Sequence, residues 1–193
     1  MNNKIYGLIA CVCMMFLVTS VQAREFKGVN LPEEILLEGV NKKINLNGVG
    51  MRTKFVFDIY VGALYLESAA NTREAVLSQN GAKRVFMHFV YDEVSAEKLV
   101  NGWNQGFEDN LTEEQLSDLA DRIKAFNAMF DTVHAGDEVL LDYLPELGTR
   151  VTIKGEVKGM IEGDDFNQAL LNIWLGDEPA DEDLKEAMLN TAD

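Results

Sequence analysis

Residues 47–67 read NGVGMRTKFVFDIYVGALYLE and form the longest run of strand-like sequence in this chain. β-Branched and aromatic residues fill its second half, while Gly48 and Gly50 mark its start, as is typical of a strand that follows a turn. Alternate residues of a strand point to opposite faces of a sheet. Nearly all odd-numbered residues from Thr53 to Tyr65 are apolar. If no bulge intervenes, this odd face is expected to pack a core.

The even-numbered face of the same run carries Arg52 and Tyr60 on largely apolar ground. A guanidinium group stays charged at any ordinary pH and presents a planar fork that fits a carboxylate or a phenolate. A tyrosine hydroxyl can add a second hydrogen bond to the same anion. The two residues are therefore a candidate anion site. The alternative is a solvated surface on which Lys54 and Asp58 are their charged neighbours.

The rest of the chain contains further strand and helix patterns on both sides of this run. Ser95 is a predicted helix N-cap, and Thr112 with Gln115 forms a predicted capping box. Strand patterns occupy residues 35–37, 43–46, 50–67, 83–91, 137–143 and 149–158, and helix patterns occupy 72–79, 96–110, a segment from Thr112, a segment from Asp164 or Asp165 to Gly176, and 181–189. This order of elements predicts an α+β domain with helices layered on an antiparallel sheet.

Residues 1–23 have the pattern of a secretory signal peptide, and residues 24–193 are expected to form one domain. A positive residue, an apolar stretch and a small-residue cleavage site follow one another at Lys4, residues 5–18 and Val21-Gln22-Ala23. Cleavage after Ala23 predicts a periplasmic or secreted protein with no stable membrane anchor. The alternative is lipoprotein processing at Cys11, because residues 8–11 read LIAC, but the apolar stretch continues well past that cysteine.

The composition excludes several classes of function. The formal net charge is −15, and it becomes −16 without the signal peptide because Lys4 is its only charged residue. A domain this acidic repels phosphate backbones, so we expect no nucleic-acid partner. Both cysteines, Cys11 and Cys13, lie in the signal peptide. The exported domain is therefore expected to have no disulfide and no thiolate metal site.

The sequence also gives no sign of a metal or a cofactor. His88 and His134 are the only histidines, and no HxH or HxxxH spacing occurs. The motifs GxSxG, GxGxxG and GxxxxGK[ST], which mark hydrolase elbows and nucleotide sites, are absent as well. We therefore predict no bound metal and no cofactor.

Two motifs at opposite ends of the chain resemble one known family. Residues 48–67, GVGMRTKFVFDIYVGALYLE, and residues 166–189, FNQALLNIWLGDEPADEDLKEAML, are similar to the chalcone isomerase-like family in its bacterial, exported branch. Tyr91 and Trp103 bracket a helix start between them as in that family. The resemblance implies an open-faced β-sandwich, in which a large antiparallel sheet is covered by a layer of helices.

The resemblance also implies a ligand cleft and its residues. In catalytic plant members an Arg holds the substrate oxyanion, and this Arg corresponds to Arg52, while a catalytic Tyr corresponds to Tyr91. The family's strand Thr, helix Asn and late hydroxyl residue are replaced here by Tyr60, Lys98 and Asn167. In the non-catalytic, fatty-acid-binding branch an Arg and a strand Tyr clamp a carboxylate. Arg52 and Tyr60 match that pattern more closely.

Three functions follow from these residues. The leading hypothesis is a non-catalytic protein that binds a small amphipathic anion, such as a fatty acid, between sheet and helices. The second is an intramolecular lyase or isomerase that acts on a phenolic enone of the chalcone type, with Arg52 and Tyr91 as catalytic residues. The third is a periplasmic interaction module with a vestigial cleft. The expected partner in the first two is a small amphipathic or aromatic ligand.

Overall fold

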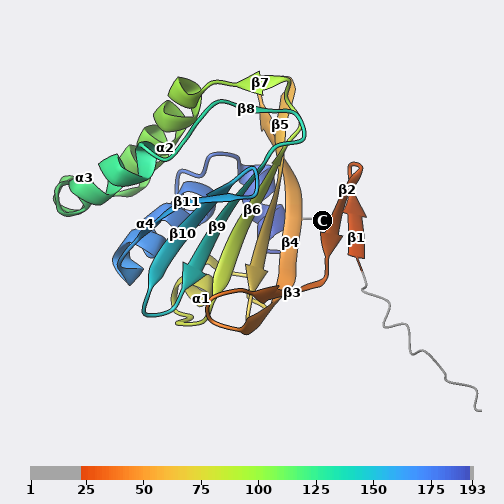
Figure 1. The fold of residues 1–193 in the computed structure, drawn as a ribbon, viewed down its shortest axis with the longest axis horizontal. Coiled ribbons are helices and arrows are strands. Elements are labelled where there is room, and N and C mark those ends of the chain that lie inside the picture. Colours follow the sequence, from red (N-terminus) through yellow and green to blue (C-terminus); the bar gives the residue numbers. More distant parts are fainter. Residues whose placement is uncertain (1–22, 192–193) are drawn as a thin grey trace, which may run out of the picture.

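The computed structural model of the chain describes residues 23–191. The predicted signal peptide, apart from Ala23, and Cys11 lie outside this range. The strands are β1 (Ala23–Phe26), β2 (Val29–Pro32), β3 (Glu34–Leu37), β4 (Lys42–Lys54), β5 (Phe57–Leu66), β6 (Lys83–Phe89), β7 (Glu93–Val94), β8 (Val133–His134), β9 (Glu138–Leu144), β10 (Gly148–Ile153) and β11 (Glu156–Ile161) (Figure 1). The helices are α1 (Arg73–Leu77), α2 (Ala96–Asn110), α3 (Glu113–Asn127), α4 (Asp164–Leu175) and α5 (Glu182–Met188).

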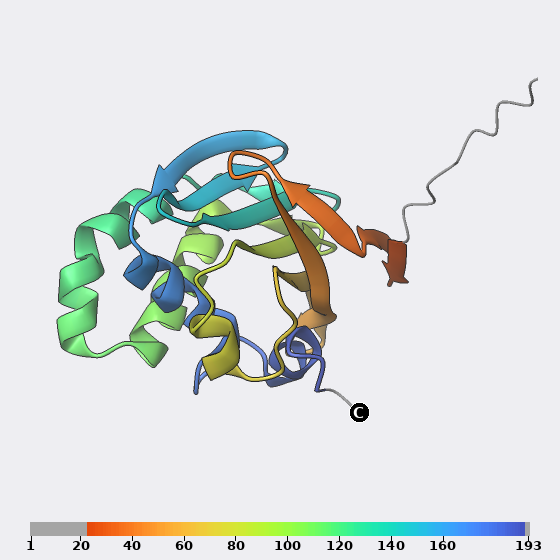
Figure 2. The same cartoon turned by 90° about the horizontal axis from the view of Figure 1, so that it is seen from below.

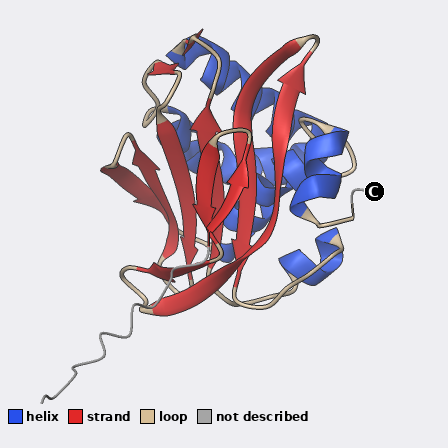
Figure 3. Ribbon diagram, turned by 90° about the vertical axis from the view of Figure 1, so that its right-hand side faces the viewer, coloured by secondary structure: helices blue, strands red, loops and turns tan. Residues whose placement is uncertain are grey.

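One large antiparallel sheet of seven strands organises the molecule, in the order β11-β10-β9-β6-β5-β4-β3. Two small sheets pair β1 with β2 and β7 with β8. The helices lie on one side of the large sheet (Figure 3), and the sheet curves around them (Figure 2). The predicted α+β class, with a large antiparallel sheet covered by a layer of helices, is confirmed.

Apolar side chains cover both faces of the sheet. On the helix side, aromatic rings from α2, α3, α4 and the residues after α3 form a cluster whose neighbouring centroids lie 4.8–6.3 Å apart: Trp103, Phe107, Phe126, Phe130, Phe166 and Trp174. On the other side, β2 and β3 pack Leu31 and Leu37 in one cluster with Val61, Ala63 and Tyr65 of β5. The odd-numbered face from Thr53 to Tyr65 was expected to pack a core, and Val61, Ala63 and Tyr65 do so, on the face of the sheet away from the helices. The expectation is wrong for Thr53, Phe55 and Phe57, which are exposed near the turn.

The expectation of one continuous strand over residues 50–67 is wrong. The chain reverses at Phe55 and Val56, so that β4 and β5 form an antiparallel hairpin. The predicted strand 149–158 is likewise two strands, joined at Lys154 and Gly155. Phe55 and Lys154 both have positive φ angles, 59° and 55°. The first reversal has no usual turn residue, so the hydrophobic pattern runs through Phe55 and Val56 unbroken. At the second, Gly155 has a φ of 78° and is a typical turn residue that the prediction passed over.

Gly48 and Gly50 lie inside β4, not at a turn before it. Both face α5, which packs closely on this strand. A Cβ at Gly50 would lie 2.6 Å from the Cβ of Ala187, and one at Gly48 would overlap the Ala187 carbonyl oxygen. The missing side chains therefore let α5 rest directly on the β4 backbone, because glycine allows close approach of another backbone.

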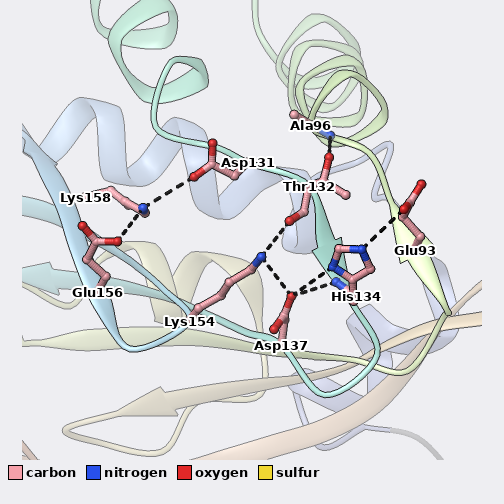
Figure 4. A network of polar contacts seen from close by, with 9 residues as sticks. All are labelled: Glu93, Ala96, Asp131, Thr132, His134, Asp137, Lys154, Glu156 and Lys158. Carbon is pink, nitrogen blue, oxygen red and sulfur yellow. Dashed lines mark hydrogen bonds and ion pairs between the residues drawn. The ribbon is translucent and has the colours of Figure 1, made fainter.

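A polar network ties the β7–β8 sheet and the start of α2 to the turn between β10 and β11 (Figure 4). Lys154 Nζ lies 3.2 Å from Asp137 Oδ2 and donates to the Thr132 carbonyl at 2.8 Å. The Thr132 hydroxyl accepts from the Ala96 N–H at 3.3 Å. A hydrogen bond from the His134 N–H, together with Lys154, holds the pKa of Asp137 below its ordinary value. The network fixes α2 over the aromatic cluster.

No helix within residues 23–191 combines the length and the apolar character that a membrane span requires. The same residues contain no group of three or more His, Cys, Asp or Glu side chains placed to hold a metal ion.

Candidate functional site

The register of the β4–β5 hairpin places Arg52 and Tyr60 side by side. Arg52 is paired directly with Tyr60 across the two strands, and directly opposed residues of an antiparallel pair point to the same face. The Cζ of Arg52 lies 5.7 Å from the centre of the Tyr60 ring, within cation–π range. The two residues therefore share a face because two strands pair, and not because one strand alternates.

Tyr60 is held from the helix side. Its side chain is buried, its hydroxyl accepts a hydrogen bond of 2.8 Å from Trp174 Nε1 in α4, and its ring centroid lies 5.4 Å from that of Phe89. Burial raises the pKa of Tyr60 above its ordinary value, although the nearby Arg52 charge opposes the shift. The hydroxyl therefore stays protonated, and its own proton is left for a further acceptor.

Arg52 is half-buried and has no anionic partner within residues 23–191, where its side chain donates no hydrogen bond. The other five arginines each lie within 3.6 Å of a carboxylate oxygen: Arg24, Arg73, Arg84, Arg122 and Arg150. A partly buried charge is unfavourable unless it is paired. An unpaired guanidinium beside a buried phenol has the chemistry to bind an anion.

Residues 23–190 match the model of a family described as chalcone isomerase-like. This chain belongs to the chalcone isomerase-like family. No curated protein matches the sequence. One similar solved structure is a fatty-acid binding protein of Arabidopsis thaliana, 16% identical in sequence, with a TM-score of 0.61 over 82% of this chain and 96% of that chain. At this identity the similarity establishes the shared fold.

Of two other residues proposed from the chalcone isomerase-like resemblance, Tyr91 lies at the edge of the site and Lys98 has no polar contact with it among the described residues. Tyr91 is half-buried, its ring meets Phe57 edge-on at 5.7 Å, and its N–H donates to the Ile59 carbonyl at 3.2 Å. It thus flanks the hairpin next to Tyr60. Lys98 is exposed on the first turn of α2, and no hydrogen bond or ion pair within residues 23–191 joins its side chain to the Arg52–Tyr60 pair.

Asn167 does not belong to this site. It is buried in the first turn of α4, and its amide donates to the Thr149 hydroxyl on β10 at 3.3 Å. Strand β10 lies four strand spacings from β4, about 19 Å across the sheet. Through the register, Thr149 is also level with Leu66, about 20 Å along β5 from Tyr60. The prediction placed Asn167 at the cleft because it corresponds to the family's late hydroxyl residue, but the two ends of α4 cover different parts of the sheet.

Two residues that complete the surroundings of the pair were not predicted to do so. Trp174 orients the Tyr60 hydroxyl, and Asp181 accepts the Thr53 N–H at 2.8 Å while it caps α5 through the Leu184 N–H at 2.9 Å. The sequence marks Asp181 as a helix-start acid and Trp174 as a core residue at helical spacing. Neither pattern shows which strand residue Asp181 or Trp174 contacts.

Asn167 lies instead near a second polar cluster, in which the buried Lys83 and Tyr143 meet the exposed Asp164. The Lys83 ammonium lies 4.6 Å from the centre of the Tyr143 ring and donates to the carbonyl oxygens of Gln79 and Gly81. The Tyr143 hydroxyl donates to Asp164 Oδ1 at 2.6 Å. Burial lowers the pKa of Lys83 to about 8, although Asp164 opposes this shift.

The Lys83 pKa predicts an unusual dependence of stability on pH. Between pH 8 and its ordinary pKa of 10.5, this amine binds more protons in the unfolded chain than in the folded protein. Stability from this group therefore rises with pH across that window. In urea titrations from pH 8 to pH 10, we expect the free energy of unfolding to rise relative to that of Lys83→Met. A difference that stays flat or falls would show that burial does not disfavour the charged amine.

Two hollows lie elsewhere on the molecule. An open groove of about 400 Å³ between α2 and α3 is lined by residues that include Asn104, Phe107, Leu116 and Asn127. A smaller one of about 130 Å³, on the opposite face of the sheet, is lined by residues that include Tyr65 and Arg84. Neither is lined by Arg52 or Tyr60, and the Tyr60 side chain is packed against Phe89 and Trp174.

Proposed function

We propose that this is an exported protein of a bacterial chalcone isomerase-like branch that binds a small amphipathic anion, such as a fatty acid, without catalysing a reaction. The observation that carries the proposal is the half-buried Arg52, the one arginine within residues 23–191 that lacks a carboxylate partner. The similar fold of a fatty-acid binding protein supports the choice of ligand. The signal-like segment ending at Ala23 supports export to the periplasm or the exterior.

The pair supplies complementary contacts to an acid head group. The Arg52 fork offers charge-assisted hydrogen bonds, and the neutral Tyr60 hydroxyl, already an acceptor from Trp174, still has a proton to donate. A charge-assisted contact of this kind is worth about 1.5–3 kcal/mol. Each buried methylene of the tail adds about 0.8 kcal/mol. Tail length would therefore set most of the affinity, and Arg52 would set the orientation of the ligand.

The arrangement around the pair favours binding over catalysis. Chalcone cyclisation needs a cation for the phenolate and a group that polarises the enone. Tyr60, at the position of the family's strand Thr, is buried and bonded to Trp174. Asn167 lies in another region, and Lys98 points to solvent. Phe89 and Trp174 pack against Tyr60 in this conformation, so a ligand tail that enters between sheet and helices requires α4 to shift outward.

Replacing Arg52 by glutamine is expected to weaken fatty-acid binding by about 10- to 100-fold, because it removes the charge-assisted contact. Titration of the purified protein with a fluorescent fatty acid measures this change. The methyl ester, which has no charged head, should bind wild type and variant alike. Arg24→Gln is the matched control, since Arg24 is exposed and paired with Glu33.

Three outcomes would contradict this assignment. If the wild-type protein takes up no fatty acid and carries no lipid detectable by mass spectrometry after extraction, a fatty acid is not its ligand. Equally tight binding by the Arg52→Gln variant would show that Arg52 does not bind the acid group. Loss of chalcone absorbance at a rate above buffer, abolished by the same substitution, would identify an isomerase instead.

A further inference from the structure

The turn of the β4–β5 hairpin exposes three consecutive large apolar side chains. Phe55, Val56 and Phe57 are 90%, 84% and 52% exposed. We refer to these three residues as the hairpin tip. In Figure 1 the hairpin reaches the end of the molecule where β7 and β8 lie. The other large apolar side chains that are exposed within residues 23–191 are not consecutive in sequence: Leu36, Leu147, Val157 and Met160.

The tip is held in a backbone conformation that its sequence does not favour. Phe55 has a φ of 59°, in the left-handed region. Bulky residues rarely adopt this region, and tight hairpin turns usually place Gly, Asn or Asp there. An Asn-Gly pair would close the same hairpin with less strain and without exposed apolar surface. Unfavourable backbone conformations cluster at functional sites, so the tip has the character of a contact surface.

The size and shape of the tip indicate what it contacts. Its three side chains expose about 400 Å², given the usual areas of aromatic side chains. A stable protein interface buries about 800 Å² on each partner, twice this amount. A narrow projection is better suited to insertion between lipid head groups than to a flat partner surface.

The residues behind the tip suit contact with the interface of a bilayer that carries no net charge. Lys54 is exposed next to Phe55, where its aliphatic stem can follow the apolar residues while its ammonium stays in water. The half-buried Tyr91 packs on Phe57 and has the amphipathic ring typical of membrane–water boundaries. Asp58, Asp92, Glu93 and Asp181 add negative charge nearby, which disfavours anionic lipid.

We infer that the hairpin tip inserts into the interfacial region of a zwitterionic phospholipid bilayer. Insertion is driven by burial of the tip side chains and does not require anionic lipid. The contact does not depend on the proposed ligand. It would, however, bring the Arg52–Tyr60 pair, which lies only three residues behind the tip on each strand of the hairpin, close to the membrane surface.

The test places a reporter in the tip of the full-length chain. Phe55→Trp is mixed, without fatty acid, with phosphatidylcholine vesicles whose acyl chains carry bromine. The added tryptophan is expected to shift its emission to shorter wavelength and to be quenched several-fold. The parent protein should show little quenching, because Trp103 and Trp174 are 5% and 1% exposed. No quenching of the added tryptophan would overturn the inference.

A matched pair of double variants separates the tip from other apolar surface. Phe55→Ser with Val56→Ser is expected to reduce the vesicle quenching of a Phe57→Trp reporter by at least tenfold. Leu36→Ser with Val157→Ser, at residues 56% and 59% exposed, should leave that quenching unchanged. Equal effects of the two pairs would overturn the inference. Quenching that occurs only with phosphatidylglycerol vesicles and disappears in salt would also overturn it. So would binding of a protein through the tip when the protein binds no vesicles.

These readouts contain no fatty acid. Failure of vesicle insertion therefore leaves the ligand proposal intact, and failure of ligand binding leaves the bilayer contact intact.

Discussion

Replacing Gly48 by alanine is expected to lower the free energy of unfolding by more than about 3 kcal/mol, at the upper end of the overpacking range. An added Cβ would overlap the Ala187 carbonyl oxygen and would also lie 2.6 Å from the carbonyl oxygen of Met188. Backbone atoms cannot rotate away as a side chain can. Moving α5 outward would also break the bond of 2.8 Å from the Asn47 amide to the same Met188 carbonyl.

The control for this prediction is a glycine-to-alanine substitution at a position where the added Cβ contacts no other atom. A Cβ at Gly102, in the middle of the exposed side of α2, would meet nothing within 4 Å. Gly102→Ala should therefore stabilise the protein by about 0.5–1 kcal/mol, since alanine is the better helix former. Urea titrations of both variants measure the two changes. A Gly48→Ala protein as stable as wild type would show that α5 does not rest on β4 in solution.

Replacing Asp142 by alanine is expected to cost about 3 kcal/mol. Its carboxylate is fully buried between two guanidinium groups, with Arg84 Nη2 at 2.9 Å and Arg150 Nη2 at 2.8 Å. The three residues are direct cross-strand neighbours on β6, β9 and β10. Arg150 also donates to the Glu38 carbonyl at 3.0 Å, which ties the β3–β4 turn to the far side of the sheet. Without the carboxylate, two cations would face each other in a mostly buried site.

Two further variants test the cause of this loss. Asp131→Ala removes a carboxylate that is 71% exposed and 3.5 Å from Lys158, so it should change stability by no more than about 0.5 kcal/mol. Replacing Arg84, Asp142 and Arg150 together by Met, Leu and Met should recover most of the stability, because no charge is then left unpaired. A triple variant no more stable than Asp142→Ala would refute the electrostatic explanation.

The elements that the sequence predicted well are those with local signals. The N-caps at Ser95 and Thr112 were placed correctly, and the capping box of Thr112 with Gln115 is present. Strand β6 alternates as expected and lies in the middle of the sheet. In each case the decisive interaction spans a few residues, so the signal is complete within the segment itself.

The errors occurred where contacts with distant parts of the chain determine the local structure. The reversal at Phe55 and Val56 lacks the usual turn residues, and Gly48 looked like a turn residue because nothing local reveals α5, about 140 positions later. Arg52 and Tyr60 were correctly predicted to share a face, although for the wrong reason. Asn167 was assigned to the cleft through the family resemblance, and the sequence does not show which end of α4 covers which strands.

The sequence by itself determined the fold class, the helix starts and the presence of an arginine and a tyrosine suited to an anion. These properties depend on residue type and short-range periodicity, which a single segment contains in full. Only the tertiary structure decided that Arg52 lacks a carboxylate partner among residues 23–191, that Trp174 orients Tyr60 and that Phe55 is exposed at a turn. Those properties depend on strand register and helix packing, which bring together side chains more than 100 residues apart.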